Sequence, residues 1–183
     1  NTLVLPVSVG EALDKLTILD IKLNKIKGDR LKDVKKEYNL LNNKLKKYVE
    51  NNKFYYNILK QINLDLWNSM DKLRDVDICS ENWINECKKT IKDNDRRFRV
   101  KKKINNLTNS SLKEQKGYKP KKAFVMTHQG MGDLLTAVGA IRYLSTCYDI
   151  VTVICCTPYY IRNLKLLYED DNNIKFYVAN DNK

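Results

Sequence analysis

Apolar residues recur along the first hundred positions at alternating intervals of three and four, the spacing of one face of an α-helix. Four such stretches run over about residues 8–27, 29–51, 54–75 and 81–107, separated by short polar breaks. Short connections between long amphipathic helices make neighbouring helices antiparallel. After a short extended N-terminus, residues 1–107 are therefore predicted to form a helical hairpin or bundle.

The first helix carries an N-terminal signal. Ser8 and Glu11 have the spacing of a capping box, in which each side chain bonds a backbone amide at the other's position. The stripes of Leu and Tyr on all four helices are interpreted as core. For Tyr55, Tyr56 and Trp67, packing is favoured over the alternative of lining a groove for a sugar or a helix.

The pattern changes after a polar segment at residues 108–121, interpreted as a linker. Short runs rich in β-branched residues then alternate with helical stretches. The predicted strands are 123–126, 150–156 and 174–178, and the predicted helices are 133–148 and 159–168. Such alternation implies right-handed crossovers and a parallel sheet covered on both faces. Residues 122–183 are thus predicted to be the opening βαβαβ of a doubly wound α/β domain, which we expect to continue beyond this sequence.

Charge leaves two interpretations open. The net charge is +12, and residues 86–103 hold nine Lys or Arg against three acids. This basic stretch could meet nucleic acid, an anionic membrane face or phosphorylated substrates, but a solvated helix face is favoured. A nucleic-acid partner is therefore disfavoured without being excluded.

Composition narrows the remaining classes. Five cysteines, none spaced as C-x-x-C, favour buried free thiols, and a single His offers little for a metal cluster. No metal site is expected. No apolar run reaches the roughly 20 residues of a membrane-spanning helix, and the expected location is the cytoplasm.

The candidate chemistry lies where the first predicted strand enters a helix. Ligands of doubly wound folds bind outside the carboxyl ends of the strands. The turn at this place contains His128, Gln129, Gly130, Met131, Gly132 and Asp133. The glycines are expected to allow positive φ and close approach of a ligand, and the first helical amides favour an anion. Asp133, at or near the N-cap, either caps the helix or takes a proton from a sugar hydroxyl.

Two common nucleotide signatures do not fit this turn. A dinucleotide fingerprint needs a third glycine where Leu135 stands, and a P-loop needs Gly-Lys-Ser/Thr. The segment 124–144 contains Gly-Asp followed by the pattern Leu-Leu-x-x-x-x-Ala-Ile-Arg-x-Leu. In this it resembles the acceptor-side half of GT-B glycosyltransferases of the heptosyltransferase (ADP-heptose) type. The resemblance covers residues 122–178. It implies that Asp133 is the base that deprotonates the acceptor, and that no bound metal or other cofactor is needed.

The N-terminal part has a second resemblance. Pro6-Val-Ser-Val-Gly-Glu-Ala-Leu-Asp-Lys-Leu-Thr-Ile-Leu-Asp-Ile-Lys22 looks like the start of small bacterial proteins of unknown function linked to surface-polysaccharide loci, and the match spans most of residues 4–118. Polar groups on the first helix are interpreted as surface pairs, such as Glu11 with Lys15. The alternative is a polar site where Glu11 or Asp14 meets Arg96 or Arg97.

The favoured function is the N-terminal, acceptor-side portion of a GT-B-type glycosyltransferase with a helical accessory module. The resemblance implies a nucleotide-sugar donor as substrate, a sugar acceptor as partner, and a donor-binding domain outside this sequence. His128, Gln129 and the amides of Gly130 and Gly132 would position acceptor or donor phosphate. The alternative is a non-enzymatic helical module that binds anionic partners through its basic face or forms a homo-oligomer.

Overall fold

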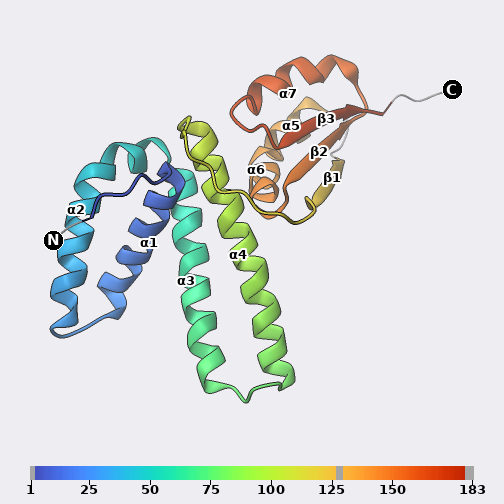
Figure 1. Cartoon of the computed structure of the whole chain (residues 1–183). Helices are drawn as coiled ribbons and strands as arrows, with labels where there is room; N and C mark the ends of the chain where they lie inside the picture. Colours follow the sequence, from blue (N-terminus) through green and yellow to red (C-terminus); the bar gives the residue numbers. More distant parts are fainter. Residues whose placement is uncertain (1–2, 127–129, 180–183) are drawn as a thin grey trace. The chain divides into compact units, whose positions relative to one another are not determined.

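The computed structural model describes residues 3–126 and 130–179. The chain divides into two compact units, Asn1–Gln115 and Lys116–Lys183. The first unit is built from helices, and the second is a small parallel sheet with helices (Figure 1). The prediction of a helical part followed by an α/β part is confirmed at this level.

The helical unit contains four long helices, close to the predicted bounds. They are α1 (Val9–Lys25), α2 (Arg30–Asn51), α3 (Lys53–Asp75) and α4 (Glu81–Leu107). The Ser8 side chain accepts a hydrogen bond from the Glu11 amide at 3.1 Å, so the predicted cap of α1 is confirmed. Ser80 caps α4 in the same way, accepting from the Trp83 amide at 3.1 Å.

Helix α1 holds this unit together, since it packs against α2, α3 and α4. Helices α3 and α4 lie side by side as an antiparallel hairpin, and α2 lies along α1 (Figure 1). The core consists of the inward stripes of all four helices, and its fully buried members include Leu13, Leu16, Leu59, Val100 and Ile104. Tyr55 and Tyr56 belong to the same core, which confirms that these two aromatics pack inside.

The second unit is a three-stranded parallel sheet in the order β1-β2-β3. Its strands are β1 (Lys122–Met126), β2 (Ile150–Cys155) and β3 (Ile174–Val178). Its helices are α5 (Met131–Thr136), α6 (Val138–Cys147) and α7 (Ile161–Leu167), with a 3-10 turn η1 (Pro158–Tyr160) before α7. The strand prediction is confirmed, and a βαβαβ unit is what the described residues form.

The predicted single helix over residues 133–148 is wrong in two respects. Helix α5 begins at Met131 after Gly130, and a turn at Ala137 separates it from α6. The Thr136 hydroxyl donates to the Asp133 carbonyl at 2.9 Å, so a local side-chain bond competes with the helical ladder just before the break.

Among the described residues of this unit, helices cover one face of the sheet, whereas both faces are expected to be covered in a complete doubly wound domain. Val151 and Val153 of β2 are buried under the helices, whereas Phe124, Met126 and Tyr177 on the opposite face are more than half exposed. The strands follow one another in sequence order, so right-handed crossovers that all proceed in the same direction place both connections on the same side. A sheet covered on both faces needs strands that are added in both directions from the first one, whereas β2 and β3 are added in one direction.

The cysteines are also less uniform than expected. All five are free thiols, but Cys155 alone is buried, while Cys79 and Cys156 are exposed. Cys155 and Cys156 differ because successive residues of a strand point to opposite sides of the sheet. Cys155 is the last residue of β2, and Cys156 follows the strand's end.

Candidate functional site

A buried polar network joins α1, α3 and α4. Its centre is Asp14 on α1, which is 1% exposed. Arg97 of α4 donates to both carboxylate oxygens of Asp14, from Nε at 2.8 Å and from Nη2. Asn63 of α3 donates to Oδ1 of Asp14 at 2.9 Å and to the hydroxyl of Thr17 at 2.7 Å. The charge of the buried Asp14 carboxylate is thus balanced by the guanidinium of Arg97, and the carboxylate also accepts a hydrogen bond from the amide of Asn63.

Charge pairing of this kind is costly to break. Hydrogen bonding to Asp14 raises the pKa of the Arg97 guanidinium, although burial opposes the shift. The Arg97 side chain is 25% exposed against 2% for Asp14, so the guanidinium reaches solvent on one side. The pair therefore has one deeply buried end and one end that can meet a ligand.

A second polar contact lies one turn further along the same helices. Lys101 of α4 donates to Glu11 at 2.7 Å and pairs with Glu114 at 2.8 Å. Burial would lower the pKa of Lys101, but its bonds to the two glutamates outweigh this and raise it. The Gly10 amide donates to Asn105 Oδ1 at 2.7 Å, next to the start of α1. The N-terminus of α1 is thereby fixed to α4 by backbone and side-chain bonds.

These contacts change the predicted polar site. Of its four residues, the structure brings Asp14 to Arg97, and Glu11 to Lys101 instead of an arginine. The predicted surface pair of Glu11 with Lys15 is wrong, because Lys15 pairs with Glu37 of α2 at 2.7 Å. Both Glu11 and Lys15 thus pair with residues of other helices.

Arg96 lies in different surroundings from Arg97. Its charge acts on Asp93, three residues earlier on α4, and lowers that carboxyl's pKa, although burial raises the pKa of Asp93 overall. Neighbouring residues on a helix point about 100° apart. Of the two arginines that the sequence leaves open as partners of Asp14, the structure pairs Arg97 with it.

The basic stretch of α4 is only partly a solvated face. Arg99, Lys101 and Lys103 are each less than 10% exposed, and Arg97 is paired with a buried carboxylate. The favoured interpretation of a solvated helix face therefore holds for part of the stretch, where Lys88, Lys89 and Lys92 are exposed. Three of the nine basic residues of this stretch are thus buried and do not add to a solvated basic face.

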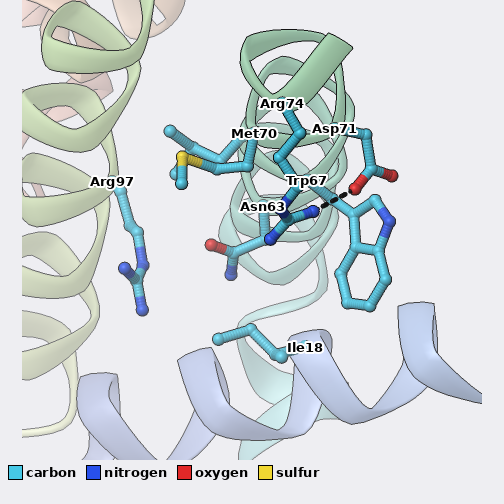
Figure 2. Close-up of a pocket in the computed structure, with 8 residues that line it drawn as sticks. Ile18, Asn63, Trp67, Met70, Asp71, Arg74 and Arg97 are labelled. Carbon is cyan, nitrogen blue, oxygen red and sulfur yellow. Dashed lines mark hydrogen bonds and ion pairs between the residues drawn. The ribbon is translucent and has the colours of Figure 1, made fainter.

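A pocket of about 280 Å³ opens beside the polar network (Figure 2). It is lined by Ile18 of α1, by Asn63, Leu66, Trp67, Met70, Asp71 and Arg74 of α3, and by Arg97 of α4. Figure 2 shows Arg97 reaching from α4 into the space beside α3, while Arg74 and Asp71 form an ion pair at 2.6 Å on the α3 side. Two residues of the network, Asn63 and Arg97, thus form part of the pocket wall.

Asp93 provides a test of the electrostatics of α4. Its Oδ2 is buried and has no hydrogen-bond partner among residues 3–126 and 130–179, and burial raises the pKa of its carboxyl. Because the folded-state pKa is raised, the protonated form stabilises the fold, and that stability is lost as pH rises from the unfolded pKa through the folded one. Replacing Asp93 with Asn, which resembles the protonated acid, is expected to raise Tm at pH 7 by a few degrees.

The stabilisation by Asp93→Asn should disappear in acid, below the unfolded pKa of about 3.9, where the wild-type carboxyl is itself protonated. Thermal unfolding at pH 3 and pH 7 followed by circular dichroism measures the difference. A lower Tm for the variant at pH 7 would show that the charged carboxylate has a partner that stabilises it.

The glycine turn of the second unit is described from Gly130 onwards, so the predicted residues His128 and Gln129 lie outside the described residues. Gly130 is the N-cap of α5 with φ −89°, and Gly132 is in the helix. Neither glycine uses the positive φ that a glycine allows, since Gly130 has a negative φ and Gly132 is helical. An N-cap has ordinary extended dihedrals that any residue adopts.

Asp133 lies in the first turn of α5 and is exposed. Its Oδ2 lies on the side of Gly130, 3.3 Å from where a Cβ on that residue would be. Met131, another predicted binding residue, packs against the hydrophobic core of the unit. The carboxylate of Asp133 is therefore the group that the described part of the turn offers to a ligand at this edge of the sheet.

Several members of the network carry no obvious local signal in the sequence. Asn63, Lys101 and Asn105 were not expected to be functional, although Arg97, Lys101 and Asn105 follow at intervals of four. Polar residues at this spacing occupy one face of a helix, and here that face meets α1. The spacing could have indicated a polar interface between helices, but not its partners.

Comparison with known proteins places the chain in a family. A family model described as a family of unknown function (DUF6165) matches residues 3–135, and the chain belongs to this family. The match includes the whole polar network, the pocket beside it and the turn at Asp133. No curated protein and no solved structure matches the chain.

Two further properties of the described residues concern membranes and metals. Among them there is no helix whose length and apolar character would let it cross a membrane. Within the same ranges, no three His, Cys, Asp or Glu side chains are grouped so that they could hold a metal ion.

Proposed function

We propose that the chain is the acceptor-side portion of a sugar-transferring enzyme of the GT-B type, with the helical unit as an accessory module. The observation that carries the proposal is the exposed carboxylate of Asp133 in the first turn of α5, the helix that comes next in the chain after the carboxyl end of β1 in a parallel sheet. Ligands of open parallel sheets bind at this edge. The heptosyltransferase-like form of residues 124–144 adds the expected chemistry.

In this proposal Asp133 acts as a general base. Its carboxylate accepts the proton of the attacking hydroxyl group, the hydroxyl oxygen bonds to the anomeric carbon of the donor sugar, and the nucleotide leaves with the electrons of the broken bond. The donor is a nucleotide sugar, which is a substrate. An exposed side chain in the first turn of a helix suits this role because a substrate can reach it without unfolding the helix.

The test is the substitution Asp133→Asn in the native protein. It keeps the shape of the side chain but removes the base, and turnover of nucleotide sugar is expected to fall by about 10²- to 10⁴-fold. The unfolding curve should be unchanged because the side chain is exposed. Glu169→Gln, which neutralises another exposed acid of the same unit, is the matched control and should retain full turnover.

Undiminished turnover in Asp133→Asn would refute the assignment of the base. A loss of equal size in Glu169→Gln would show that the charge of the unit, and not the position of one carboxylate, controls the rate.

We retain a second candidate function, a binding or oligomerisation module formed by the helical unit. The observation that favours it is the pocket bounded by Trp67, Arg74 and Arg97, which lies entirely within that unit. If the module acts through its basic helix instead, binding to nucleic acid or anionic lipid should fall steeply with salt.

A further inference from the structure

We propose that the pocket bounded by Trp67, Arg74 and Arg97 binds a small ligand with a single anionic group, a carboxylate or a phosphate ester, on a body the size of one ring. This site is independent of the proposed sugar transfer. It lies in the helical unit, whereas Asp133 belongs to the other unit.

Arg97 supplies a fixed donor for the anion. Its Nε and Nη2 are held by Asp14, which sets the plane of the guanidinium. A guanidinium has five N–H donors, and within the described ranges the structure shows no hydrogen bond or ion pair from Nη1. The Arg97 side chain is 25% exposed and lines the pocket, so a ligand can reach the remaining donors. Donors held in place before binding lower the entropic cost of binding.

Arg74 supplies a second, adjustable donor. Its ion pair with Asp71 joins side chains that are 68% and 52% exposed. Pairs so exposed contribute little and are readily exchanged. Arg74 can therefore turn from Asp71 to a ligand anion at small cost. The charged residues that line the pocket are Arg74, Arg97 and Asp71, which leave a surplus of one positive charge, and this favours a single anionic group.

The rest of the lining sets the size and character of the ligand body. Ile18, Leu66 and Met70 present apolar surface, and Trp67 adds an indole ring. An aromatic face packs well against the flat face of another ring. The pocket's volume of about 280 Å³ lies just below the range of small-molecule sites, which run from about 300 to 1,000 Å³. A ring-sized acid suits this volume.

Tryptophan fluorescence of the full 183-residue chain tests the site. The protein has two tryptophans, Trp67 and Trp83, so Trp83→Phe leaves Trp67 as the reporter. The probes are benzoate, phenyl phosphate and glucuronate, with benzamide and glucose as uncharged matches. We expect saturable changes with at least one anionic probe, weaker ones with its uncharged match, and reduced affinity in high salt. Comparison of benzoate with phenyl phosphate distinguishes the two kinds of anion.

Variants locate the binding. Arg74→Gln is expected to weaken binding of the anionic probe by about tenfold, the usual effect of losing one bond to a charged group. Arg97→Lys, which keeps the charge but not the paired donors, should weaken it as well. Lys25→Gln is the control, because Lys25 lines a separate pocket with Lys60. It should bind as tightly as the wild type, and circular dichroism checks that each variant is folded.

The proposal is overturned if none of the anionic probes gives a saturable change, or if the uncharged matches bind equally well. It is also overturned if folded Arg74→Gln binds with unchanged affinity, or if Lys25→Gln is the variant that loses binding.

Discussion

Replacing Asp14 with Ala is expected to lower the free energy of unfolding of the helical unit by about 3–5 kcal/mol, the usual cost of removing one partner of a buried ion pair. The substitution leaves the Arg97 guanidinium without its carboxylate and removes one of the two acceptors of Asn63. Asn63 is 6% exposed, so water replaces the lost acceptor poorly. Denaturation by urea, followed by far-ultraviolet circular dichroism, measures the loss because most of the helix is in this unit.

Two comparisons show whether burial is the cause. Asp71→Ala removes a carboxylate that also pairs with an arginine, but on the surface, and should cost less than about 1 kcal/mol. The double variant Asp14→Leu with Arg97→Met removes both charges and should recover much of the loss, since apolar side chains of similar size replace buried pairs well. The account is wrong if Asp14→Ala and Asp71→Ala have equal effects.

Gly10→Ala is expected to destabilise the same unit by about 2–4 kcal/mol, through overpacking and loss of a buried hydrogen bond. A Cβ at this position would lie 2.5 Å from the backbone carbonyl oxygen of Lys101 and 2.9 Å from Asn105 Oδ1. The backbone of α4 cannot move aside cheaply. The Gly10 amide would also be displaced from Asn105, to which it donates at 2.7 Å.

Helix propensity alone predicts the opposite sign, because Ala is favoured over Gly inside a helix by about 1 kcal/mol. Gly139 of α6 is the matched control, since a Cβ there meets no atom within 4 Å. Gly139→Ala should therefore be neutral or stabilising. If urea denaturation finds Gly10→Ala as stable as the wild type, the close approach of α1 to α4 is refuted.

Much of the fold was predictable because its signals are local. Apolar spacing and the Ser8 cap place the helices within a few residues, and β-branched runs place the three strands. The uncovered face of the sheet follows from the strand order, because strands added in one direction carry their right-handed crossovers on one side. A complete doubly wound sheet has helices on both faces, and β1, β2 and β3 alone have them on one.

The candidate site was less predictable because its contacts join distant parts of the chain. Asp14 and Arg97 are 83 positions apart, and Gly10 and Asn105 are 95 apart. The sequence suggested Asp14 with Arg97 as one of several pairings, but nothing local distinguished Arg97 from Arg96. The packing of α1 against α3 and α4 decides between the two arginines, because it brings Asp14 to Arg97.

The central claim is that the native protein transfers sugar from a nucleotide-sugar donor. The most direct measurement is release of free nucleotide from a panel that includes ADP-heptose and UDP-, GDP- and CMP-linked sugars, with and without an extract of cell-surface glycans. The account predicts release from at least one donor, faster with the extract, and a glycan product heavier by one sugar residue. Absence of release and of product with every donor would contradict it.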